Sequence, residues 1–120
     1  MQRPLSPHLQ VYRPQVTSVM SIMHRAAGVA ASVGIVFVSL LFMAAPYGAG
    51  TWQAVADLVF SAPGALILAL LAAAVFYHLC NGIRHLFWDS GRGLDIASIH
   101  RSAIAVLAVA AVLTLAAVFS

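Results

Sequence analysis

Three long runs of apolar and small residues constrain this 120-residue chain more than any other feature. They cover about residues 19–45, 63–88 and 101–119. Each run is long enough to cross a hydrocarbon layer of about 30 Å, which takes roughly 20 helical residues. Because an open strand in lipid would leave its backbone polar groups unsatisfied, each run is predicted to be a helix. The predicted fold class is all-α integral membrane, with three transmembrane helices in a single domain, residues 19–120.

The composition indicates that lipid is the solvent of these helices. Hydrophobic residues make up 62% of the chain and charged residues 8%, whereas soluble domains average about 45–50% and 25%. All basic residues are arginines beside the apolar runs, a pattern that argues against nucleic-acid binding. The single cysteine, Cys80, excludes an internal disulfide and the attachment motif of a c-type haem.

The arginines predict the orientation of the chain. They lie near the start of the first run and around the second connection, and the first connection, residues 46–62, has none. Because basic ends lie on the cytoplasmic side, the N-terminus is predicted to be cytoplasmic. No cleavable targeting peptide is visible, so the apolar runs themselves should direct insertion. The expected location is the cytoplasmic (inner) membrane of a bacterium, or the mitochondrial inner membrane in a eukaryote.

Residues 1–18 are expected to form an extended arm on the cytoplasmic side. The segment contains three prolines and shows no helical period. Its apolar side chains would suit the docking of a soluble partner, and a disordered tail is the alternative interpretation.

Ionisable side chains inside a span cost at least about 2.5–3.5 kcal/mol on insertion scales, so they are functional candidates. His78 is the deepest of them, roughly 15 Å below Trp88 at 1.5 Å per residue. It shares a helical face with Asn81, Gly82 and His85. Gly82 would leave a notch in which a flat group could lie against the backbone. A deep imidazole beside such a notch is typical of haem sites in helical bundles.

A six-coordinate haem on His78 would need a second imidazole from elsewhere. His85 lies about 10.5 Å away along the same helix, whereas the two axial nitrogens of an iron are roughly 4 Å apart. His24 is predicted to lie one to two turns too shallow. The second ligand is therefore expected from another subunit.

A shallower polar layer is predicted near the cytoplasmic ends of the first two helices, consisting of His24, Arg25, Arg84 and His85. Haem propionates pointing toward the cytoplasm would reach this layer, and arginine pairs well with carboxylates. The alternative is that these side chains simply extend to the interface, and that Arg84 pairs with Asp89.

Two segments resemble a known family. RPLSPHLQVYRPQVTSVMSIMHR, from Arg3 to Arg25, resembles the opening of the cytochrome b556 type of large anchor subunit in the succinate–quinone oxidoreductase family. HLCNGIRHLFWDSGRGL, from His78 to Leu94, is similar to the second signature of the same subunit. The family often has Thr before the glycine that follows the first segment, and this chain has Ala27 there. That departure removes no proposed ligand.

The resemblance implies membership of a four-subunit succinate dehydrogenase. A flavoprotein oxidises succinate, an iron–sulfur subunit relays electrons, and two small anchors hold one b-type haem and a ubiquinone site. By resemblance, His78 is an axial haem ligand, Ser21 and Arg25 bind quinone, and His24 and Arg25 lie near the haem propionates. His85 is a further candidate for the haem environment. No residue of this chain is expected to be catalytic, and the chain is not expected to be an enzyme on its own.

Two alternatives remain at this point. One is the anchor of a quinol–fumarate reductase, which runs the same chemistry in reverse. The other is a small transporter or a purely structural anchor, but a transporter predicts acidic residues within the spans, and the three runs contain none. Small residues in the first run, Gly28, Ser32 and Gly34, predict close packing against an unspecified neighbouring helix.

Overall fold

A computed structural model describes residues 13–120, which form four α-helices and one 3-10 turn. In chain order these are α1 (Val16–Ala44), η1 (Ala45–Tyr47), α2 (Ala49–Val59), α3 (Ala62–Asp89) and α4 (Ile96–Phe119). Within the described residues, α1, α3 and α4 are long and apolar enough to cross a membrane. The predicted all-α fold with three membrane-spanning helices is therefore confirmed, and the chain is an integral membrane protein.

The helices begin earlier than the apolar runs suggested. α1 starts at Val16, so residues 16–18 are helical, although the sequence placed them in the extended arm. Residues 1–12 of that arm lie outside the described part of the chain. α4 starts five residues before the predicted position 101, because the Asp95 carboxylate caps it by accepting a hydrogen bond from the Ser98 N–H at 2.9 Å.

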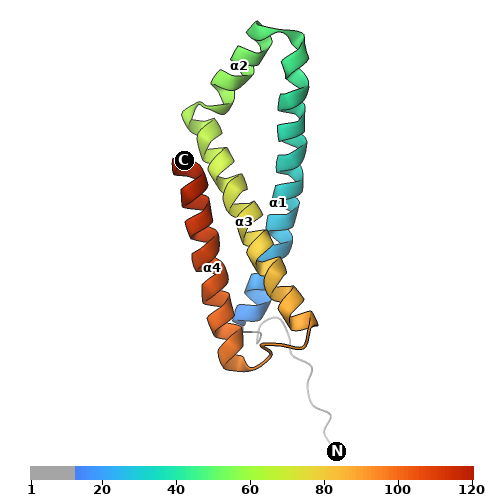
Figure 1. Cartoon of the computed structure of the whole chain (residues 1–120), viewed down its shortest axis with the longest axis vertical. Helices are drawn as coiled ribbons and strands as arrows, with labels where there is room; N and C mark the ends of the chain where they lie inside the picture. The colour runs from blue at the N-terminus through green and yellow to red at the C-terminus, as the bar shows by residue number, and fades with distance from the viewer. Residues whose placement is uncertain (1–12) are drawn as a thin grey trace, which may run out of the picture.

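The first connection is not the simple loop that was expected over residues 46–62. It contains α2, whose 11 residues span about 16 Å, too short to cross a membrane. Apolar residues recur along α2 at helical spacing, namely Trp52, Val55, Ala56 and Val59. These four side chains help to line a cavity of about 210 Å³ against α1. Figure 1 shows α2 bridging the separated ends of α1 and α3.

The three long helices meet closely at only one end of the molecule. α1 crosses α3 there, and α4 runs alongside α3 (Figure 1). The buried apolar core consists of Met20, Tyr77, Ala103, Val106 and Ala110. We call residues 16–28, 77–89 and 96–106 the polar half of the spans, and residues 29–44, 62–76 and 107–119 the apolar half.

A tight turn joins α3 to α4. Gly91 and Gly93 adopt positive φ angles of 76° and 70°, a conformation that glycine reaches without steric cost. The turn is closed by hydrogen bonds from the Gly91 N–H to the Trp88 carbonyl at 2.8 Å and from the Arg92 N–H to the Phe87 carbonyl at 3.1 Å. The chain therefore reverses direction at once, and the start of α4 lies beside the end of α3.

Candidate cofactor site at the crossing of α1 and α3

Two glycines lie where α1 crosses α3, and each faces a histidine of the other helix. A Cβ atom built on Gly28 would be 2.7 Å from Cε1 of His78, whereas one built on Gly82 would be 3.8 Å from Cε1 of His24. Carbon atoms normally approach to about 3.5–4.0 Å, so the His78 ring occupies space that exists only because residue 28 is glycine. The helix that packs against Gly28, which the sequence left unspecified, is therefore α3. The notch predicted beside Gly82 for a flat cofactor instead faces the His24 ring.

A hydrogen bond fixes the orientation of the His78 ring. Its Nδ1 lies 3.0 Å from the backbone carbonyl oxygen of His24. A carbonyl oxygen only accepts hydrogen bonds, so Nδ1 carries the proton and donates it. In this tautomer the second ring nitrogen, Nε2, keeps a free lone pair, which is the form that binds a metal.

The His24 ring stacks on the His78 ring, with their centroids 4.0 Å apart and their planes 6° from parallel. The prediction that His24 is too shallow to reach His78 is therefore wrong. The reason is the earlier start of α1, which places His24 eight residues, or about 12 Å, into the helix. His85 continues the row, with its ring centroid 5.4 Å from that of His24. The structure thus brings together three of the predicted site residues.

The chemistry of this cluster fits a haem. Histidines that bind metals nearly always donate their other ring N–H to a carbonyl or carboxylate, as His78 does. The Nδ1 atom of His24 is buried and has no hydrogen-bond partner within residues 13–120. No cluster of three or more His, Cys, Asp or Glu side chains in the same range is arranged to hold a bare metal ion. A porphyrin supplies four of the iron ligands itself and needs only one from this chain.

The two predicted quinone residues lie on α1 beside this cluster. Ser21 is half-buried and Arg25 is exposed, and a spacing of four residues places them on one face of the helix. The exposed guanidinium of Arg25 is therefore accessible to a group outside this chain.

Arg84, one residue before His85 on α3, turns its side chain into the protein. Its side chain is 5% exposed. The Nε–H donates to the Ser102 hydroxyl at 2.9 Å, and the terminal nitrogens donate to the Ile99 carbonyl at 3.1 Å and to the Asn81 side-chain oxygen at 3.3 Å. The guanidinium also lies 4.0 Å from the centroid of the Trp88 ring. Protein groups thus occupy most of its donors, and within the described residues its partners do not include Asp89. Its predicted contact with a haem propionate stays a prediction.

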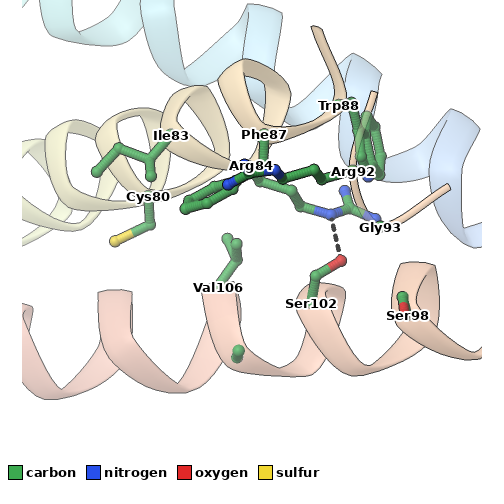
Figure 2. Close-up of a pocket in the computed structure, with 11 residues that line it drawn as sticks. Cys80, Ile83, Arg84, Phe87, Trp88, Arg92, Gly93, Ser98, Ser102 and Val106 are labelled. Carbon is green, nitrogen blue, oxygen red and sulfur yellow. Dashed lines mark hydrogen bonds between the residues drawn. The ribbon is translucent and has the colours of Figure 1, made fainter. Parts of the chain in front are cut away.

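A cavity of about 330 Å³ opens between α3 and α4 beside this network. Figure 2 shows Arg84 reaching across it to Ser102, with Trp88 and Arg92 near the same end and Cys80 at the other. Of the residues in the predicted polar layer, only Arg84 lines this cavity. The cavity adjoins the histidine cluster, because the ring of its lining residue Trp88 packs edge-on against the His85 ring, with centroids 5.1 Å apart.

Sequence reasoning also missed the contact between Tyr77 and α1. The Tyr77 hydroxyl is buried and donates to the Met20 carbonyl at 3.0 Å. This bond lies one residue before His78 and ties α3 to the turn of α1 that precedes His24. An intramembrane tyrosine next to a candidate ligand was the available signal, because a buried hydroxyl requires a partner.

Comparison with known proteins agrees with this architecture. Residues 1–117 match the family model of the succinate dehydrogenase/fumarate reductase transmembrane subunit. The chain is 44% identical over 120 residues to the succinate dehydrogenase cytochrome b556 subunit of Paracoccus denitrificans, covering 98% of this chain and 92% of that protein. It is 40% identical over 99 residues to the subunit of the same name from Rickettsia bellii, covering 82% and 77% of the two chains.

A mitochondrial protein is also similar. The succinate dehydrogenase cytochrome b560 subunit of Bos taurus is 41% identical over 112 residues, which cover 89% of this chain and 64% of the bovine protein. The similarity extends across all three spans and includes both segments on which the sequence resemblance rested. This chain therefore belongs to the family of succinate dehydrogenase/fumarate reductase transmembrane subunits.

Proposed function

We propose that this chain is the cytochrome b membrane anchor of a succinate dehydrogenase. It would bind one b-type haem together with a second small anchor subunit and form part of the site where ubiquinone is reduced. The family match and the names of the bacterial and mitochondrial relatives support this assignment. The relatives described above are all named as succinate dehydrogenase subunits, which favours this function over that of a fumarate reductase anchor.

The observation that carries the proposal is the contact between the His78 Nδ1 atom and the His24 carbonyl oxygen. Because the His24 carbonyl accepts the Nδ1 proton at 3.0 Å, Nε2 is the nitrogen left to bind iron. A b-type haem bound there supplies a centre that takes up and releases single electrons. The contribution of the chain would be to hold His78 in one tautomer and to place the His24 ring beside it.

The second axial ligand is assigned to the partner anchor. For two histidines to hold one haem, the macrocycle would have to fit between their rings. The His24 and His78 rings instead lie face to face at 4.0 Å, which leaves no room for a macrocycle between them. His85 stays in the role of a neighbour of the haem, next to His24.

Ser21 and Arg25 are proposed to form this chain's part of the quinone site. The Ser21 hydroxyl would donate a hydrogen bond to a quinone carbonyl. The Arg25 guanidinium, exposed on the same face of α1, would stabilise negative charge as it develops on a quinone oxygen. Protons would reach the site from the polar end of the helices, where Asp89 is exposed.

The remaining subunits would perform the chemistry that this chain cannot. A flavoprotein would oxidise succinate, and an iron–sulfur subunit would pass single electrons to the quinone site. This chain would anchor both to the lipid bilayer and would not be an enzyme by itself.

Purification of the chain in mild detergent tests the assignment. A flavoprotein, an iron–sulfur protein and a second small anchor should accompany it, and the complex should show reduced b-type absorption bands. His78→Ala should abolish or shift those bands, and Arg25→Ala should lower quinone affinity and quinone reduction while leaving the bands in place. His100→Ala is the matched control, because His100 is exposed on α4 and bonds only its own helix at 2.9 Å. Bands unchanged in His78→Ala would mean that the iron is held elsewhere.

A further inference from the structure

The His78 ring is held in place from several directions. Gly28 lies against its Nδ1–Cε1 edge, the His24 carbonyl accepts its Nδ1 proton, and the His24 ring covers one face. The Gly28 contact and the hydrogen bond therefore act on the same edge of the ring. Three atoms of the His78 ring lie within 4 Å of a Cβ built on Gly28, and Nε2 is the farthest of them, at 3.7 Å.

We propose that Gly28 is a positioning residue for the haem ligand. Its missing side chain allows His78 to reach the His24 carbonyl and so sets the tautomer and direction of Nε2. The inference rests on the proposed function, in which His78 binds the iron. A methyl group at position 28 would overlap Cε1 at 2.7 Å and crowd Nδ1 at 3.0 Å, so the ring must move away from α1. That movement lengthens the bond from Nδ1 to the His24 carbonyl, which is 3.0 Å long in this structure.

Loss of the hydrogen bond between His78 and the His24 carbonyl should shift the midpoint potential of the haem in one direction. An N–H donated to a carbonyl makes an imidazole a more basic ligand. A more basic ligand favours the oxidised iron, which carries the higher charge. Loss of the bond therefore favours the reduced form and raises the midpoint potential of the haem.

The chain offers a matched control for this effect. Gly34 lies on the same helix and packs against α3, but a Cβ there would meet Cδ2 of Leu71, the end of a flexible side chain, at 2.9 Å. Gly34→Ala therefore adds a methyl group at the interface between α1 and α3 without crowding the His78 ring.

The experiment compares Gly28→Ala with Gly34→Ala in the assembled complex. Gly28→Ala should change the ligand-field signals of the ferric haem, raise its midpoint potential, and increase haem loss to an apoglobin acceptor by about tenfold, the lower end of the range for lost outer-shell partners. Gly34→Ala should keep the unmutated spectrum and potential. The inference is overturned if Gly28→Ala shows the unmutated spectrum and potential, or if both variants shift them equally.

A second measurement covers the case in which Gly28→Ala does not assemble. This measurement uses the unmutated complex with isotope-labelled histidine. Electron–nuclear double resonance of the ferric haem should detect the Nδ1 proton of the histidine that binds the iron, and this proton should exchange slowly with heavy water because it is hydrogen-bonded. Rapid exchange of that proton would overturn the inference. A His78→Met variant separates the two hypotheses: an unmutated haem spectrum there refutes the haem assignment itself, whereas a changed spectrum leaves only the role of Gly28 in question.

Discussion

The polar and apolar halves of the spans are held together in different ways. In the polar half, α1, α3 and α4 are joined by buried hydrogen bonds from Tyr77 and Arg84 and by the close approach at Gly28. In the apolar half, α1 contacts α3 at Gly34 and Leu71 and then diverges from it, and no side-chain hydrogen bond among the described residues joins the three long helices there. Apolar side chains gain little in lipid by packing against one another, so close backbone contacts and hydrogen bonds decide where helices associate. We therefore expect lipid to cover much of the surface of the apolar half.

The largest effect should come from removing the arginine that joins α3 to α4. Arg84→Ala deletes its hydrogen bonds to Ser102, Ile99 and Asn81, and hydrogen bonds to charged groups contribute about 1.5–3 kcal/mol each. We expect a loss of about 3 kcal/mol or more in the free energy of unfolding, measured by denaturation of helical structure in detergent. Arg92→Ala, at an exposed arginine of the same cavity, should change stability by less than about 0.5 kcal/mol. Equal losses in both variants would contradict the importance of the buried network.

A smaller effect should distinguish the two halves along a single helix. Val106 is buried in the polar half of α4, whereas Val112 is 63% exposed in the apolar half. Val106→Ala opens a void between packed helices and should lower the free energy of unfolding by about 1 kcal/mol. Val112→Ala removes an exposed side chain, leaves no void and should change that free energy less. The same unfolding measurement applies to both variants. A greater loss for Val112→Ala would show that the halves do not differ in packing as we describe.

The smallest expected effect is a pH dependence of stability. It comes from Asp95, which lies outside the membrane at the start of α4. Hydrogen bonds from the Ser98 side chain and backbone hold the pKa of Asp95 below its ordinary value of 3.8. A carboxylate with a lowered pKa stabilises the folded chain above the unfolded pKa, and this stability is lost as the pH falls through the folded pKa. The unmutated chain should therefore lose a small amount of stability from pH 5 to below about pH 4. Asp95→Asn should lack that part of the loss, and an unchanged pH profile would exclude the effect.

Much of the fold was predictable because length and hydropathy determine which segments cross a bilayer. The second predicted span, residues 63–88, differs from α3 by one residue at each end. The first residues of the helices were harder to predict, because capping residues determine where a helix begins and hydropathy does not. Asp95 extends α4 into a polar segment, and the residues at the start of α1 are not strongly apolar. The short helix α2 was missed, although its apolar spacing was visible in the sequence.

The candidate site was predictable in part for a related reason. His78 was recognised from its depth, and His85 from its position on the same helical face. The pairing of His78 with His24 depends on the crossing point of two helices, which no single-helix pattern contains. The partners of Arg84 were not predicted, because Ser102 lies on α4 and the alignment of α4 beside α3 depends on the turn at Gly91 and Gly93. The proposed roles of Ser21 and Arg25 depend on groups outside this chain.

The turn between α3 and α4 has a consequence for biogenesis. The oxygen atoms that bind Arg84 come from residues 81–102, a stretch of chain that is contiguous in the sequence. A guanidinium exposed to hydrocarbon is costly, but each nitrogen of this one has an oxygen partner before α1 has docked, and only the contact with the Met20 sulfur at 3.6 Å waits for α1. We therefore expect α3 and α4 to leave the translocation machinery together as a hairpin, with the buried cation already shielded.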